Sequence, residues 1–192
     1  IVLAASMADG HLNNSHFMYK NKNLELIAKV KLSVKKLFTD VKINERVDKN
    51  GTPYLLCPVF VKRQLERLGS PTGKKLFKNP KIPNIIKNGT KTQKKFFIQQ
   101  FFDDEGWAET KTMKIACCQA SDTTTVLNSN LIKNLQFDKK YTPGLLSKSI
   151  KSKIVKPNIL LDIQRILNND FSINSTLTFV RLSKFHKYRS SE

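Results

Sequence analysis

Two short apolar segments of this chain each end in an acidic residue followed by glycine. The first is Val2–Gly10, with the sequence VLAASMADG, and the second is Ile98–Gly106, with the sequence IQQFFDDEG. Each pattern predicts an apolar helix that stops at its glycine, because glycine adopts the left-handed dihedral angles beyond a helix end without a steric cost. Their recurrence at domain-length spacing predicts two related halves within one polypeptide.

The acidic residues of both segments lie at the helix end where a carboxylate is least favoured, because a helix C-terminus carries partial negative charge. Acidic residues are also scarce, with 15 Asp and Glu against 34 Lys and Arg. Sequence features that break a local rule concentrate at functional sites. A hard cation such as Mg²⁺ would offset the unfavourable charge through oxygen ligands, so Asp9 and the run 103–105 are candidate metal ligands.

The formal net charge of +19 over 192 residues indicates a polyanionic partner. A hydrophobic content of 40% is typical of a folded protein, so a basic globular domain that binds nucleic acid is predicted. A membrane surface is the competing partner, but no basic amphipathic helix with a clean apolar face is evident. No apolar run approaches the roughly 20 residues of a membrane span, so no membrane association is predicted.

The three cysteines, Cys57, Cys117 and Cys118, suit neither a disulfide framework nor a zinc site. Reduced cysteines indicate an intracellular location, in a prokaryotic cytoplasm or an organelle. The first residues lack the charged region of a secretion signal, and the chain opens on Ile1. We therefore expect a fragment or domain of a longer polypeptide that begins inside its first helix.

Residues 1–70 have the pattern of one complete half. Asn23 is a suitable N-cap for a helix over residues 24–38, and Gly69 is suited to end a second helix over 61–68. Alternating apolar residues predict strands separated by a hairpin turn at residues 48–51. The expected elements are a turn over 11–15 and strands over 16–20, 41–48 and 52–60.

Residues 71–95 are rich in Pro, Gly and Lys and are predicted to form a linker with a basic lead into the second segment. Residues 96–192 are predicted to form the second half. This half lacks counterparts of the strand and helix that residues 52–68 supply in the first half. The expected elements are strands over 107–119, 146–155 and 173–182, a long loop over 121–144, and a helix over 157–168.

Together, the two acid-tipped segments resemble the paired motifs of the LAGLIDADG homing endonucleases in their monomeric, two-motif form. Ala8, Asp9 and Gly10 match the last three motif positions, and the second motif is a variant ending in FFDDEG. The linker adds LGSPTGKK and KIPNII, which are similar to the stretch before the second motif in archaeal and intein-borne members. The resemblance covers most of residues 1–120 and the segment 158–177.

This resemblance implies an α+β fold with two αββαβ-type halves related by a pseudo-twofold axis. The two motif helices would pack side by side at the centre, and the antiparallel sheets would form a saddle for DNA. Ala4 and Ala8 lie on one helical face and suit close packing, whereas Gln100 and Asp104 occupy the matching positions of the second segment. Small residues on the first helix leave room for larger ones on the second.

The resemblance also implies a site for Mg²⁺ or Mn²⁺, in which each carboxylate serves the cut of one DNA strand. Asp9 and Glu105 would supply the carboxylates, and Ala8 and Asp104 would add backbone carbonyls. Lys75 is the preferred basic residue near the first carboxylate. The alternatives for that role are Lys74, Lys78, Lys81 and Asn21.

Polar faces on the predicted strands would contact double-stranded DNA in the major groove, where base edges carry a distinctive pattern of donors and acceptors. Lysines on these faces are better suited to phosphate contacts than to base contacts. The predicted DNA-binding residues are Lys42, Asn44, Arg46 and Lys74 in and after the first half, and Ser149, Lys151 and Lys153 in the second half.

The sequence thus predicts a metal-dependent, site-specific double-strand DNA endonuclease of the homing type. One alternative is an RNA-binding maturase that assists intron splicing, with intron RNA as its partner. A second is a non-catalytic DNA-binding domain with the same fold, and a third is the endonuclease portion of an intein. In each case we expect a monomer with internal pseudo-symmetry.

Overall fold

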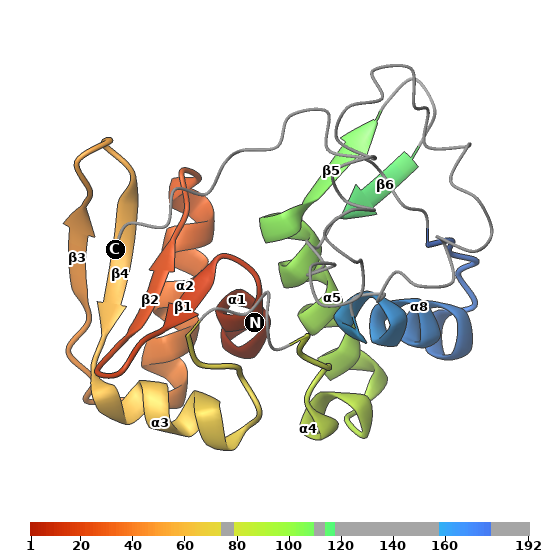
Figure 1. The fold of residues 1–192 in the computed structure, drawn as a ribbon, viewed down its shortest axis with the longest axis horizontal. Coiled ribbons are helices and arrows are strands. Elements are labelled where there is room, and N and C mark those ends of the chain that lie inside the picture. Colours follow the sequence, from red (N-terminus) through yellow and green to blue (C-terminus); the bar gives the residue numbers. More distant parts are fainter. Residues whose placement is uncertain (74–78, 110–113, 118–157, 178–192) are drawn as a thin grey trace, which may run out of the picture. The chain divides into compact units, whose positions relative to one another are not determined.

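The computed structural model describes residues 1–73, 79–109, 114–117 and 158–177. Except for Thr176 and Leu177, these residues belong to one compact unit made of Ile1–Asp122 and Lys156–Ser175. Within the described ranges the fold is mixed α and β, with a four-stranded antiparallel sheet, a two-stranded sheet and six helices (Figure 1). The predicted α+β class is therefore confirmed.

The four-stranded sheet contains β1 (Gly10–Leu12), β2 (Phe17–Lys20), β3 (Asn44–Val47) and β4 (Pro53–Cys57). Its strand order is β1-β2-β4-β3, and every neighbouring pair is antiparallel. Phe17 lies opposite Cys57 and Tyr19 lies opposite Leu55, and all four side chains are fully buried. These residues share one face of the sheet because side chains alternate along a strand, so this face forms part of the core.

Helix α1 (Val2–Met7) is buried along its whole length, so it is a core helix and not an amphipathic surface helix. It contacts the sheet through β1 and β2, and it also packs against α2 (Leu24–Leu37) and α5 (Lys91–Glu105) (Figure 1). Both predicted apolar helices therefore exist and lie next to each other. The second is longer than its motif because the basic lead forms its first turns.

Gly10 and Gly106 were predicted to end their helices in left-handed dihedral angles. This prediction is wrong, because neither glycine adopts such angles. Gly106 is extended, with φ −102° and ψ 168°, and begins a strand. Gly10 begins β1, and a Cβ atom there would lie 2.6 Å from both the Ala5 carbonyl oxygen and the Ser6 Cα. Close backbone approach, and not turn geometry, requires glycine at position 10.

Most predicted elements of residues 1–70 are confirmed. The side chain of Asn23 accepts a hydrogen bond from the Glu25 amide at 2.9 Å and caps α2. Gly51 in the β3–β4 turn and Gly69 after α3 (Val59–Arg67) have φ values of +76° and +97°, which favour glycine. The expected turn over residues 11–15 is partly wrong, because His11 and Leu12 belong to β1 and pair with β2.

The described residues after α5 match the predicted elements less closely. The expected strand over 107–119 contains two antiparallel strands, β5 (Gly106–Glu109) and β6 (Lys114–Cys117). The expected helix is confirmed as α8 (Asn158–Phe171), whereas residues 173–177 form no strand. The predicted strand over 146–155 and loop over 121–144 lie outside the described residues.

Hydrogen bonds attach the linker to α8. Asn79 Oδ1 accepts a hydrogen bond from the Asn158 amide at 2.7 Å, and Asp162 accepts one from the Ile82 amide at 3.0 Å. Asp162 is 5% exposed and also pairs with Lys87, whose Nζ lies 3.2 Å away in the short helix α4 (Asn84–Lys87). The linker end that precedes α5 is therefore part of the folded core.

We expect Thr90→Ala to lower the free energy of unfolding by about 1 kcal/mol, because Thr90 is the N-cap of α5. Its hydroxyl accepts a hydrogen bond from the Gln93 amide, and the Gln93 side chain accepts one from the Thr90 amide. Urea denaturation followed by circular dichroism measures the change. Thr90→Ser retains the hydroxyl and should remain close to wild type, so equal losses in both variants would contradict the capping role.

Candidate functional site

The carboxyl ends of α1 and α5 bring two acidic side chains to one side-chain amide. Asp9 follows α1 and is exposed, whereas Asp104 lies in the last turn of α5 and is half-buried. Asn21 Nδ2 donates to Asp9 Oδ2 at 2.8 Å and lies 3.5 Å from Asp104 Oδ1. The acids of the two predicted motif segments are therefore neighbours in space.

Asn21 directly follows β2, and its amide orientation is set by a local turn. Asn21 Oδ1 accepts a hydrogen bond from the Asn23 backbone amide at 2.8 Å, which leaves Nδ2 directed toward the acids. Such a turn is a common use of Asn, because its side chain mimics a backbone carbonyl. Asn21 was predicted only as an alternative to Lys75, and the structure places it in contact with Asp9.

Asp104 is held from two sides, by a strand and by its own helix. The Tyr19 hydroxyl on β2 donates to Asp104 Oδ1 at 2.6 Å. Gln100 Nε2 lies one helical turn before Asp104 and is 3.2 Å from Oδ1 and 3.1 Å from Oδ2. The carboxylate therefore has a defined orientation.

Gln100 is fully buried, and its Oε1 atom has no hydrogen-bond partner among the described residues. A buried polar atom without a partner costs about 1–3 kcal/mol. Turning the amide over would direct an oxygen toward the Asp104 carboxylate, which is less favourable still. Gln100 therefore contributes a contact to Asp104 at the expense of stability.

Burial raises the pKa of the Asp104 carboxyl to about 6, and repulsion from Asp9 and Asp103 adds to the increase. Hydrogen bonds from Tyr19 and Gln100 act in the opposite direction. Burial and the hydrogen bond to Asp104 also raise the pKa of the Tyr19 hydroxyl far above its usual range, so Tyr19 remains a donor at neutral pH. Asp104 is therefore a carboxylate that a nearby cation would stabilise.

Asp104→Asn is expected to stabilise the protein by about 1–2 kcal/mol at pH 7.5 in metal-free buffer. The folded-state pKa of about 6 exceeds that of an unfolded Asp, so the folded state binds the proton more tightly. Wild-type stability should therefore fall as the pH rises from 4 through 6, and this slope should be reduced in Asp104→Asn.

Melting temperatures measured between pH 4 and pH 7.5 test this prediction. Asp103→Asn is the control, because it removes a neighbouring exposed acid and leaves the half-buried one in place. Identical pH profiles for wild type and Asp104→Asn would show that titration of Asp104 does not cause the loss of stability with rising pH.

The side chains at this site are compatible with Mg²⁺ or Mn²⁺. Among the residues that the structure describes, no three His, Cys, Asp or Glu side chains form a metal-binding group. Mg²⁺ is commonly bound by one or two carboxylates together with waters and substrate phosphates, so a pair of acids is a sufficient protein contribution. Burial raises the pKa of Asp104 and repulsion from Asp9 adds to the increase, and a divalent cation bound between the two acids would offset both effects.

The other predicted metal and catalytic residues lie at the end of α5, after α1 and in the linker. Glu105 is the last residue of α5 and is half-buried, and Ala8 is the buried C-cap of α1. The exposed Lys81 precedes the buried Ile82 in the linker. Lys74, Lys75 and Lys78 lie outside the described residues.

The predicted DNA-binding residues of the first half lie in and beside β3. Asn44 and Arg46 are exposed on this edge strand, opposite Leu56 and Tyr54 of β4, and Lys42 is exposed just before it. Asn44 and Arg46 alternate with Glu45, so they share one face of the sheet. Ser149, Lys151 and Lys153 lie outside the described residues.

The sequence-based reasoning missed Tyr19, gave Gln100 no role in the site, and preferred the Glu105 carboxylate to that of Asp104 among the candidate acids of residues 103–105. One signal was available, because Phe97, Gln100, Phe101 and Asp104 follow the i, i+3, i+4, i+7 spacing of a single helical face. Phe97, Gln100 and Phe101 are all buried. Extending that face by one turn selects Asp104 as the acid directed toward the protein interior.

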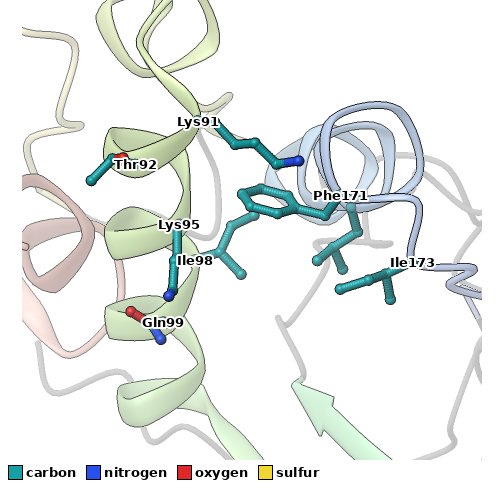
Figure 2. Close-up of a pocket in the computed structure, with 8 residues that line it drawn as sticks. Lys91, Thr92, Lys95, Ile98, Gln99, Phe171 and Ile173 are labelled. Atoms are coloured by element: carbon teal, nitrogen blue, oxygen red, sulfur yellow. The ribbon is translucent and has the colours of Figure 1, made fainter.

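A separate pocket of about 540 Å³ lies between the early turns of α5 and the end of α8 (Figure 2). Ile98, Leu167, Phe171 and Ile173 give it an apolar lining, and Lys91 and Lys95 contribute charge. The Lys91 ammonium lies 5.3 Å from the centre of the Phe171 ring, within cation–π range. The pocket lining does not include the acids at the helix ends.

Comparisons with protein-family models and with curated proteins give no match to this chain. Within the ranges that the structure describes, no helix combines the length and hydrophobicity needed to cross a membrane.

Proposed function

We propose that this protein is a site-specific, divalent-metal-dependent DNA endonuclease of the LAGLIDADG homing type. The observation that carries the proposal is the placement of Asp9 and Asp104 at the carboxyl ends of two contacting helices, within reach of one Asn21 amide. The two apolar segments that carry these acids were predicted to pack side by side. The pseudo-twofold arrangement of two halves is part of this proposal.

Asp9 and Asp104 would bind Mg²⁺ or Mn²⁺, and Glu105 remains the alternative carboxylate of the second segment. When bound, the cation would supply Lewis-acid stabilisation of the phosphodiester and an activated water. Asn21 would orient Asp9, and Tyr19 and Gln100 would orient Asp104. Exposed Lys42, Asn44 and Arg46 would contact the duplex along β3.

A plasmid cleavage assay tests the proposal. The genomic context of the reading frame identifies any gene that it interrupts, and the plasmid carries the uninterrupted form of that gene. We expect linear product with Mg²⁺ or Mn²⁺, and none with Ca²⁺ or EDTA. Absence of cleavage under all four conditions would contradict the proposed activity.

The high positive charge predicts that binding to the duplex depends steeply on salt. Affinity for DNA should fall by about 10³-fold between 50 and 200 mM salt, because lysines and arginines displace condensed counterions from phosphates. Fluorescence anisotropy with labelled target and scrambled duplexes measures this change. A salt-independent affinity would argue against phosphate-dominated binding.

A second candidate, a non-catalytic nucleic-acid-binding domain or splicing maturase with the same fold, is favoured by one observation. Both Asp104 oxygens already receive hydrogen bonds from the protein, as in a purely structural acid. A splicing assay with any intron that encodes the chain distinguishes the two functions. Splicing acceleration that survives both Asp9→Asn and Asp104→Asn would favour the maturase.

A further inference from the structure

We propose that Tyr19 and Gln100 are positioning residues that orient the Asp104 carboxylate toward a divalent cation. Tyr19 belongs to the predicted first half, so that half would fix the orientation of the Asp104 carboxylate in the predicted second half. The proposal rests on the proposed function in one respect: the use of the bound cation in DNA cleavage. It assigns a role to two residues for which the motif resemblance implies no part in metal binding.

The contacts come from two independent elements. Tyr19 is fully buried on β2, and Gln100 is fully buried on α5. The hydroxyl reaches Asp104 Oδ1 at 2.6 Å, and the amide reaches Oδ2 at 3.1 Å. Rotation of the carboxylate would break at least one of these bonds, so the pair permits one orientation.

The hydrogen bonds leave a defined atom for a ligand. A carboxylate oxygen can accept about two hydrogen bonds. Oδ1 is contacted by both Tyr19 and Gln100, whereas Oδ2 is contacted by Gln100 within the described part of the chain. Oδ2 is therefore the oxygen that retains acceptor capacity for a cation, and such orienting partners tune metal affinity.

The orphaned Oε1 atom of Gln100 supports a role beyond packing. This atom has no hydrogen-bond partner among the described residues, although the side chain is fully buried. Methionine has a similar length and would fill the same space without an unsatisfied carbonyl. A residue selected only to pack α5 would therefore not need the amide, but a residue that orients Asp104 does.

The test measures Mn²⁺ binding to the metal-free, DNA-free full chain by electron paramagnetic resonance of the unbound ion. Relative to wild type, we expect Tyr19→Phe and Gln100→Met each to weaken Mn²⁺ binding about tenfold. The matched controls are Tyr54→Phe and Gln99→Met. Tyr54 lies opposite Lys20 and so faces the other side of the sheet from Tyr19, and Gln99 is exposed. Both controls should bind Mn²⁺ as wild type does.

Thermal melts of the metal-free proteins separate positioning from a structural role. Gln100→Met should melt at or above the wild-type temperature, because it removes a buried unsatisfied carbonyl. A structural residue would give the opposite pattern, with a lower melting temperature and unchanged Mn²⁺ affinity. Unfolding of both variants would also overturn the proposal.

The remaining outcomes distinguish this proposal from the proposed function. Wild-type Mn²⁺ affinity in both folded variants would overturn the positioning role and leave the endonuclease standing. Weakened affinity in the variants, together with no cleavage by the wild-type protein, would support the positioning role and overturn the endonuclease. A wild-type protein that binds no Mn²⁺ in the absence of DNA would overturn the positioning role, and the plasmid cleavage assay would still decide on the endonuclease, because substrate phosphates also supply metal ligands.

Discussion

Asp9→Asn and Asp104→Asn are each expected to slow cutting of one DNA strand by at least about 10³-fold, with little change in affinity for the target duplex. The two acids lie at separate helix ends and share the Asn21 amide. If each serves one strand, either single variant should convert supercoiled plasmid to the nicked form, and the double variant should leave it intact. Strand-specific end labels identify which strand each variant still cuts.

Glu105→Gln is the decisive comparison, because Glu105 follows Asp104 directly and was the acid predicted from the motif. We expect this variant to retain cleavage of both strands. If Glu105→Gln cuts one strand only and Asp104→Asn cuts both, the assignment of Asp104 is wrong. Unchanged double-strand cutting in Asp9→Asn would remove the metal-site proposal altogether.

Gly10→Ala is expected to lower the free energy of unfolding by about 3 kcal/mol, near the upper end of typical overpacking costs. The added Cβ would lie 2.6 Å from the Ala5 carbonyl oxygen and 2.8 Å from the Phe17 ring. Both atoms belong to the core, and α1 would have to move away from β1 to relieve the contact. Chemical denaturation measures the loss, and Asp9, the adjacent residue, should lose its alignment with Asn21.

Gly51→Ala is the matched control for this substitution. A Cβ at Gly51 would meet no atom within 4 Å, but the residue has φ +76° and so incurs a conformational cost. That cost is about 1–2 kcal/mol for an L-residue in the left-handed region. A larger loss in Gly51→Ala than in Gly10→Ala would contradict the close-packing explanation for Gly10.

Much of the first half was predictable because its signals are local. The Asn23 cap, the alternating strand before the turn and Gly69 after α3 each act within a few residues. The role of Gly10 was not predictable in this way, because the atoms nearest its missing side chain include Phe17 of another strand. The antiparallel strands β5 and β6 were predicted as a single strand, because the sequence between them carries no strong turn signal.

The segments of the candidate site were predicted from the sequence, but its individual side chains were predicted only in part. The apolar pattern selected the two helix ends and Asp9, because sequence defines where a helix stops more readily than how it is rotated. Successive helical residues differ by about 100° in direction, so Asp104 and Glu105 face different neighbours. Tyr19 was missed because its contact with Asp104 joins residues that are distant in the chain.

The bond between Tyr19 and Asp104 has a consequence for gene duplication and recombination. In the first segment, alanines at positions 4 and 8 match Gln100 and Asp104 of the second. A protein assembled from two copies of residues 1–73 would therefore have alanine in place of the Asp104 carboxylate that Tyr19 contacts. Residues 1–73 therefore cannot replace the segment that carries Asp104, and a chimera that keeps this site must inherit Tyr19, Gln100 and Asp104 together.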